Sequence, residues 1–152
     1  MAIFHLSQQV IGRGNGKSAM AASAYRACVK LVEEVCDKAD GVVKRIVHDY
    51  RNKKGLEFSV ILAPDAVSKD SWVFDRQKLW SEVQNCEKRT DAQFAREFNI
   101  ALPVELSREE NKELIIAYVQ DTFVSLGMVA DISIMIIQII LMHMLCLQCG
   151  IW

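Results

Sequence analysis

The sequence predicts an α+β fold, and three observations support that prediction. The chain has 152 residues, the length of about one domain, and 51% of them are apolar. It contains two prolines and seven glycines, a composition that excludes disordered and collagen-like proteins. Segments with strand periodicity and segments with helix periodicity alternate in a mixed order, which is typical of α+β proteins.

The first predicted strand covers residues 2–6 and 10–11, and the glycine-rich loop 12–16 ends it. This loop is similar to a phosphate-binding P-loop, but Ile11 occupies the position where that motif has its first glycine. The P-loop interpretation therefore fails. Arg13 and Lys17 still place two cations beside a predicted helix N-terminus, a suitable surface for phosphates.

Asn15 or Ser18 is predicted to cap a helix whose apolar residues recur at a spacing near 3.6 as far as Val35. Residues 37–41 end this helix. Two short strands follow, at 42–47 and 57–62, on either side of the charged turn 51–55.

A second helix is predicted over residues 75–87, with one face formed by Leu79, Trp80, Val83 and Cys86. Residues 98–102 form a strand that ends before Pro103. Ser107 and Glu110 have the spacing of a capping box, which predicts a helix to about Leu126 with the apolar residues Leu114, Ile115, Tyr118, Val119 and Phe123. Gly127 ends that helix, and a last strand covers residues 128–134.

The net charge of −1 hides an uneven distribution. Residues 1–54 contain ten Lys and Arg against five Asp and Glu, a net charge of +5, and residues 55–131 contain eight against fourteen, a net charge of −6. Residues 132–152 carry no charged side chain. The basic segment favours contact with a polyanion, and the acidic segment is typical of solvated helix faces.

The five cysteines are odd in number and irregularly spaced, which argues against a disulfide framework and favours a cytoplasmic location. Cys146 and Cys149 form a C-x-x-C motif that could be redox-active or half of a zinc site. The chain has no second cysteine pair, and His143 is the nearest imidazole, so we expect no function for the motif.

Several short segments carry a more specific signal. They are residues 1–6, Arg13, Gly16, Ser18, Ala19, 24–26, 48–50, 87–89, 95–98, 100–106 and 127–131. In sequence, order and spacing they resemble the plasmid mobilisation relaxases of the MobA/MobL family over residues 1–134. The resemblance implies a central antiparallel sheet with helices packed on one side of it, a relaxase or HUH-nuclease-like fold that is incomplete at the C-terminus.

The resemblance also implies an activity. The family nicks one DNA strand at a transfer origin, and a tyrosine becomes covalently linked to the 5′ phosphate. Tyr25 matches this nucleophile, and Glu97 matches one of two acidic positions, of which the second is Asn99 here. A phenol, with a pKa of about 10, needs a cation or metal to stabilise its negative charge. Arg13, Lys17 and Arg26 are the residues that we expect to hold DNA phosphates.

Without the resemblance, Tyr25 would be read as a core residue of an amphipathic helix and Glu97 as a solvent-facing strand residue. His5 is expected to be packed by its neighbours, and His48 to lie in an exposed turn. The partners implied are single-stranded origin DNA and other mobilisation proteins.

The family holds a divalent ion, Mg²⁺ or Mn²⁺, with three histidines after the strand that ends at Ile134. This chain has Met135, Met142 and Met144 at the three positions, and a thioether does not replace imidazole for a phosphate-activating ion. We therefore expect no metal to be bound here and no cleavage activity.

Codon arithmetic offers a reason for the methionines. The family-like peptide I-H-D-N-S-D-N-P-H-A-H-V-M-L-T-M, written in AT-rich codons, becomes the sequence of residues 134–148 when its first C is removed. The hypothesis is that residues 1–134 are the N-terminal part of a relaxase domain and that residues 135–152 are an out-of-frame tail.

Two alternatives remain open. The uncharged segment 132–152 is long enough to be a membrane anchor, although Gln138, His143 and Gln148 interrupt it and no Lys or Arg flanks it. The chain could also be a non-enzymatic DNA-binding or membrane-associated remnant. We expect a relaxase fragment without membrane contact.

Overall fold

The computed structural model describes residues 5–36, 41–86 and 88–136, and it describes residues 139–145 by their backbone. The strands are β1 (Leu6–Gly12), β2 (Lys30–Cys36), β3 (Val43–Asp49), β4 (Leu56–Leu62), β5 (Gln93–Ala101), β6 (Val129–Met135) and β7 (Ile139–Leu145). The helices are α1 (Ala19–Ala27), α2 (Arg76–Cys86) and α3 (Arg108–Thr122).

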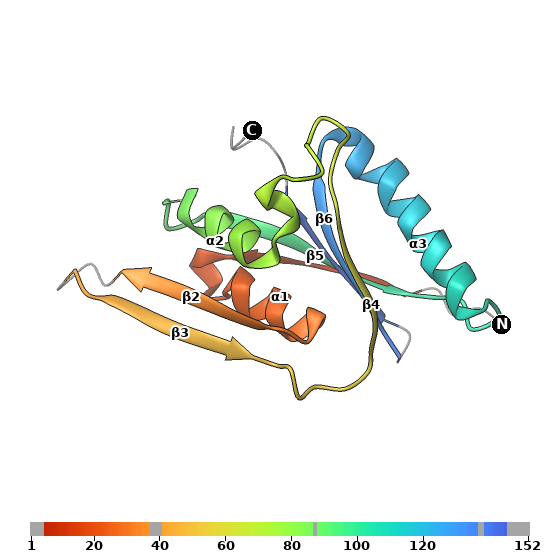
Figure 1. Ribbon diagram of the computed structural model, residues 1–152, viewed down its shortest axis with the longest axis horizontal. Helices are drawn as coiled ribbons and strands as arrows, with labels where there is room; N and C mark the ends of the chain where they lie inside the picture. Colours follow the sequence, from red (N-terminus) through yellow and green to blue (C-terminus); the bar gives the residue numbers. More distant parts are fainter. Residues whose placement is uncertain (1–4, 37–40, 87, 137–138, 146–152) are drawn as a thin grey trace.

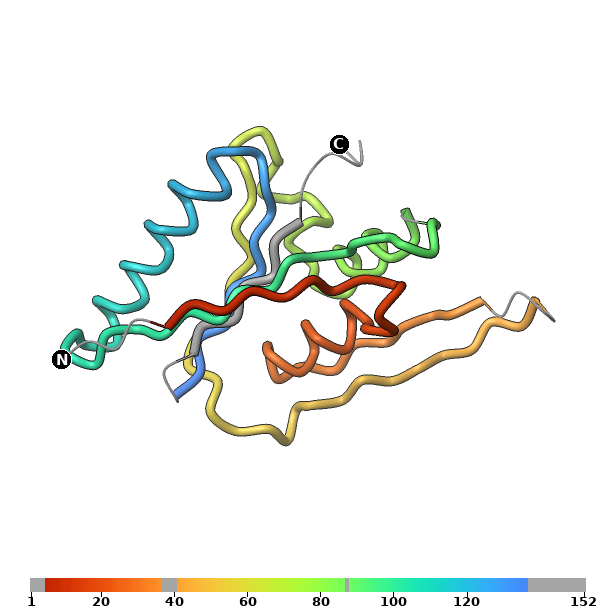
Figure 2. The backbone as a smooth tube through the Cα atoms, turned by 180° about the vertical axis from the view of Figure 1, so that it is seen from behind, coloured from red at the N-terminus to blue at the C-terminus, as the bar shows by residue number. Residues whose placement is uncertain are grey.

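The centre of the fold is an antiparallel sheet with the strand order β1-β5-β7-β6-β4 (Figure 1). The first strand lies along β5, which is far from it in the sequence, as the view from behind also shows (Figure 2). A separate antiparallel pair, β2 and β3, packs beside α1 and α2. The predicted α+β class with an antiparallel sheet is confirmed.

Helices cover both faces of the sheet, so the expectation of helices on one side is wrong. Strand β6 shows why, because all of its residues from Val129 to Ile134 are buried and successive side chains of a strand point to opposite faces. Val129 belongs to a core with α1 and α2, whereas Ile132 and Ile134 belong to a second core with α3. A strand that is buried on both faces needs cover on both.

The first helix is shorter than predicted, because α1 ends at Ala27 and residues 30–36 form β2. Cys28 adopts a left-handed conformation with φ of 52°, which turns the chain out of the helix. Residues 30–36 then pair along their whole length with β3. The apolar spacing of Leu31 and Val35 fits a helix equally well, and the strand partner decided between the two. The predicted helix end at residues 37–40 lies outside the described residues.

The other predicted elements are present with shifted ends, and residues 2–4 of the first predicted strand lie outside the described residues. Ser107 and Glu110 do form a capping box on α3: the Ser107 N–H donates to Glu110 Oε2 at 2.8 Å, and the Glu110 N–H donates to Ser107 Oγ at 3.3 Å. These hydrogen bonds lower the pKa of Glu110. Three side chains predicted on apolar faces, Cys86, Leu114 and Tyr118, are exposed. None of the helices in the described part of the chain is long and apolar enough to cross a membrane.

Replacing Cys28 by glycine is expected to stabilise the fold. A side chain in the left-handed region is strained, and glycine removes that strain at the end of α1. We expect the free energy of unfolding to rise by about 1 kcal/mol in urea denaturation, because the strain of a left-handed side chain exceeds the entropic cost of glycine. Cys28→Ala is the control, since it removes the thiol and keeps the strain. An equal gain from both variants would show that the thiol, and not the backbone, is responsible.

Candidate functional site

Tyr25 lies in the last turn of α1, and its side chain is 46% exposed. It is therefore accessible to a ligand and is not a core residue. The rings of Tyr25 and Tyr50 pack edge to face, with 5.3 Å between the ring centroids and an interplanar angle of 88°. The Lys53 ammonium group lies 3.5 Å from the centroid of the Tyr25 ring. The phenol thus combines exposure with contacts to two neighbouring side chains.

The next residue, Arg26, points into the protein and forms an ion pair with Glu97 of β5. Glu97 is 1% exposed, so the interpretation of this residue as solvent-facing is wrong. Its Oε2 accepts a hydrogen bond of 2.6 Å from Gln9 Nε2, and Gln9 Oε1 accepts one of 2.6 Å from Lys17 Nζ. Three predicted site residues, Arg26, Glu97 and Lys17, are thereby connected through Gln9 of β1.

Burial lowers the pKa of Arg26 to about 10, while negative charge on Tyr25 and on Asp131 acts in the opposite direction. A pKa of about 10 leaves the guanidinium charged at neutral pH. Arg26 is therefore a positively charged partner of Glu97, in a partly dehydrated setting where charge interactions are strong, and Tyr25 also interacts with it electrostatically.

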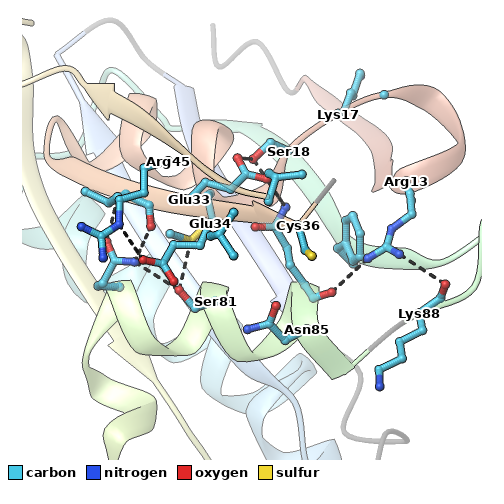
Figure 3. Close-up of a pocket in the computed structure, with 18 residues that line it drawn as sticks. Arg13, Lys17, Ser18, Glu33, Glu34, Cys36, Arg45, Ser81, Asn85 and Lys88 are labelled. Atoms are coloured by element: carbon cyan, nitrogen blue, oxygen red, sulfur yellow. Dashed lines mark hydrogen bonds and ion pairs between the residues drawn. The ribbon is translucent and has the colours of Figure 1, made fainter. Parts of the chain in front are cut away.

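Arg13 makes contacts within the protein in addition to the phosphate contact that the sequence predicts. Its Nη2 donates to the Gln84 carbonyl at 3.1 Å, in the last turn of α2, and its Nη1 donates to the Lys88 carbonyl at 3.3 Å, just after the helix (Figure 3). The guanidinium also lies 5.4 Å from the centroid of the Phe94 ring. A cation that satisfies the free carbonyls of a helix C-terminus stabilises that helix. Arg13 thus anchors α2, and both Arg13 and Lys17 are exposed.

A second buried carboxylate, Asp131 of β6, joins α1, α2 and the sheet. Asp131 accepts hydrogen bonds from Ser23 Oγ at 2.7 Å and from Trp80 Nε1 at 3.0 Å. Arg76 donates to both of its oxygens, with 2.7 Å from Nη2 to Oδ1 and 3.0 Å from Nε to Oδ2. The same Arg76 Nη2 also reaches Ser59 Oγ at 2.7 Å on β4. These bonds fix where both helices sit on the sheet.

His48 lies on β3 and not in an exposed turn as predicted. Its side chain is 14% exposed, and its Nε2 is 2.8 Å from Glu33 Oε2. Glu33 Oε2 also accepts from Ser18 Oγ at 2.6 Å, and Glu33 Oε1 accepts from Gln84 Nε2 at 3.1 Å. Of these side chains, Ser18, Glu33 and Gln84 line a groove between β2 and α2 (Figure 3). The described contacts connect His48 to the β2–β3 pair and not to Tyr25.

The predicted metal positions lie at the end of β6 and along β7. Met135 ends β6, and the backbones of Met142 and Met144 lie on β7 between β5 and β6. The side chains of β7 and the C-x-x-C of Cys146 and Cys149 lie outside the described residues. Among the described side chains, no group of three or more His, Cys, Asp and Glu residues could hold a metal ion.

Among the side chains that the structure describes, the potential ligands are already engaged or stand apart from one another. His5 is exposed at the start of β1, and His48 is engaged with Glu33. Glu97 and Asp131 each pair with an arginine, which neutralises the negative charge that a cation would need.

Sequence reasoning missed Gln9, Asp131 and the pair Tyr50–Lys53 as members of this region. For Asp131 a signal existed, because an acid within the apolar segment 129–134 is rarely buried unless it is paired. Tyr50 belongs to the family-like segment 48–50, but nothing in the sequence placed it or Lys53 beside Tyr25. They reach Tyr25 from a turn that is distant in the sequence.

Comparison with known proteins identifies the family. The model of the MobA/MobL family matches residues 17–139. The chain belongs to the MobA/MobL family. It is 37% identical over 139 residues to the conjugal transfer protein TraA of Rhizobium radiobacter, and 37% identical over 134 residues to the mobilization protein MobL of Acidithiobacillus ferridurans. The resemblance predicted from the short segments is confirmed.

The alignments cover 86% and 88% of this MobA/MobL chain, but 12% of TraA and 32% of MobL. The chain thus spans less than a third of the length of these relatives. A solved structure described as "Molecular Basis of Vancomycin Resistance Transfer in Staphylococcus aureus" is also similar, with a TM-score of 0.75 and 28% identity. That similarity covers 95% of this chain and 70% of the solved one.

Replacing Asp131 by asparagine is expected to lower the free energy of unfolding by about 3 kcal/mol, because it leaves the Arg76 charge without its carboxylate. Urea denaturation followed by tryptophan fluorescence measures the change, since Trp80 bonds to the same group. Asp121→Asn on α3 is the matched control at an exposed position. Equal stability of both variants would contradict the role given to Asp131.

Proposed function

We propose that this chain is a relaxase-type DNA-binding unit that recognises single-stranded DNA at a transfer origin, carries Tyr25 as its nucleophile and does not cleave in its present form. The observation that carries the proposal is an exposed Tyr25 at the end of α1, followed in sequence by Arg26 with its buried partner Glu97, in a chain of the MobA/MobL family. An exposed tyrosine with a fixed neighbouring cation is suited to attack a phosphodiester.

The reaction of such a site is a transesterification. Tyr25 Oη loses its proton, forms a bond to the phosphorus of the scissile phosphate and displaces the 3′ oxygen, which takes up a proton. One phosphate ester is lost and one is formed, so the strand is opened while the 5′ end stays linked to the protein. Arg26 would stabilise the additional negative charge on the phosphate oxygens.

The methionines bear on whether this chain can perform the step. Metal stabilisation of phosphate charge supplies several kcal/mol, and about 1.4 kcal/mol changes a rate tenfold. With Met135, Met142 and Met144 at the expected ligand positions, we propose that Tyr25 lacks this assistance. A shifted reading frame from Met135 onward accounts for all three replacements together.

Lys17 is proposed to contact DNA phosphates, and Arg13 to act through the stability of α2. Lys17→Glu should weaken the binding of single-stranded DNA about threefold to tenfold and reduce the salt dependence of the affinity. Fluorescence anisotropy in a salt series measures both effects. Lys69→Glu, which makes the same charge change at an exposed position in the acidic segment, is the control. Equal losses in both variants would mean that total charge, and not a site, governs binding.

The cleavage proposal is tested by pairing this chain with a version in which one base restores the frame after Ile134. Both are incubated with single-stranded origin DNA and Mn²⁺ or Mg²⁺, and covalent adducts are separated on denaturing gels. We expect an adduct in the restored version, its loss in restored Tyr25→Phe with DNA binding unchanged, and none in the present chain. Adduct formation by the restored Tyr25→Phe variant would assign the nucleophile elsewhere, with Tyr50 tested next. Cleavage by the present chain at a similar rate would overturn the loss of activity.

A further inference from the structure

The turn between β3 and β4 brings a lysine onto the face of the proposed nucleophile. Lys53 Nζ lies 3.5 Å from the centroid of the Tyr25 ring and donates a hydrogen bond of 3.1 Å to the Tyr25 carbonyl. The same ammonium group thus contacts both the backbone and the ring of one residue. A cation over an aromatic face at this distance is attracted by the π-electrons.

The turn holds Lys53 in place through backbone hydrogen bonds. The Tyr50 N–H donates to the Val29 carbonyl at 3.2 Å, directly after α1, and the Lys53 N–H donates to the Tyr50 carbonyl at 2.9 Å. The Tyr50 ring then meets the Tyr25 ring nearly at a right angle. The phenol is therefore contacted by a second ring and by a cation while almost half of its surface stays open.

We propose that Lys53 is a positioning residue for Tyr25: its ammonium group fixes the phenol ring and stabilises the negative charge that develops in the ring when the hydroxyl loses its proton. A phenolate spreads part of its charge into the ring, so a cation over the ring face interacts more strongly with the charged form than with the neutral one. This inference rests on the proposed role of Tyr25 and adds the group that prepares it.

A purely structural role for Lys53 must be distinguished from this one. Lys53 also satisfies the Tyr25 carbonyl, one of the last carbonyls of α1, and that bond alone would stabilise the helix end. The two roles separate in the chemistry of the phenol, because a helix cap changes stability but not the reactivity of the Tyr25 hydroxyl.

The chain contains a matched internal reference in Tyr118. Its exposure of 44% is close to the 46% of Tyr25, and its ring meets Phe123 edge to face at 5.9 Å. Among the described residues, no cation lies over the Tyr118 ring. The two tyrosines are therefore similar in exposure and in having one aromatic neighbour, and of the two rings Lys53 lies over that of Tyr25.

The experiment measures O-acetylation of tyrosines by N-acetylimidazole in the complete chain, with the modified sites quantified by mass spectrometry. In this reaction the phenolate oxygen bonds to the acetyl carbon and imidazole leaves. We expect the ratio of Tyr25 to Tyr118 modification to fall about fivefold in Lys53→Met, which is the size of one cation–π interaction. Lys53→Arg keeps the positive charge and should keep the ratio close to that of the original chain. Lys54→Met, at the neighbouring exposed position, should leave the ratio unchanged.

Lys53→Gln keeps an N–H donor for the helix end but removes the charge, so it tests the proposal even if Lys53→Met does not fold. The proposal would be overturned if the ratio of Tyr25 to Tyr118 acetylation in Lys53→Gln equalled the ratio in the chain without a substitution. A fall in Lys53→Arg as large as in Lys53→Gln would overturn it as well. The readout does not require cleavage. If the acetylation ratio depends on Lys53 but the frame-restored Tyr25→Phe variant still forms a DNA adduct, Tyr25 is not the nucleophile and the effect of Lys53 on its ring stands. If the ratio does not depend on Lys53 and that variant forms no adduct, only the role of Lys53 is rejected.

Discussion

The position of α1 and α2 on their face of the sheet depends on one buried carboxylate. Asp131 receives hydrogen bonds from Ser23 of α1 and from Arg76 and Trp80 of α2, and Arg76 continues to Ser59 of β4. An ion pair in the interior contributes little net stability, because both charges lose their hydration. Its geometric demands are strict, however, and an alternative packing would leave a charge unpaired. Asp131 thus fixes which surfaces of α1 and α2 meet the sheet.

Glu97 repeats this arrangement one strand beyond β7. The strand register aligns Glu97 of β5, His143 of β7 and Asp131 of β6 across the sheet. Each carboxylate accepts an arginine from a different helix, Arg26 from α1 and Arg76 from α2. Helix α1 is therefore tied at Ser23 and at Arg26, and Tyr25 lies between these two attachments. The phenol of Tyr25 can face solvent because the side chains of Ser23 and Arg26 are the ones that bind to the sheet.

The site is also tied to the turn that follows β3. Tyr50 and Lys53 reach the end of α1 from a segment that the β2–β3 pair delivers, and the pair is held near α1 and α2 by Glu33, Ser18, His48 and Gln84. The hydrogen bonds around Glu33 therefore bear indirectly on Tyr25. Arg13 contributes from the other side by completing the C-terminus of α2. The surroundings of the phenol are thus built from elements that are far apart in the sequence.

The sequence by itself determined the fold class, the family and most of the elements, because these are written in local patterns. The capping box at Ser107 and Glu110, the break at Gly127 and the alternating apolar segments are local signals, and the short motifs were sufficient to identify the MobA/MobL family. Tyr25, Arg26 and Glu97 could be selected in the same way, although their roles remain predictions.

Tertiary structure decided everything that depends on distant partners. Residues 30–36 have a spacing that fits a helix and became a strand because β3 pairs with them. Glu97 is buried because Arg26 and Gln9 meet it there, and Arg13 anchors a helix because the C-terminus of α2 lies beside it. Lys53 reaches Tyr25 across 28 positions of the sequence. Hydrogen bonds and ion pairs of this kind depend on the separation of atoms in space, which a local pattern of residues does not encode.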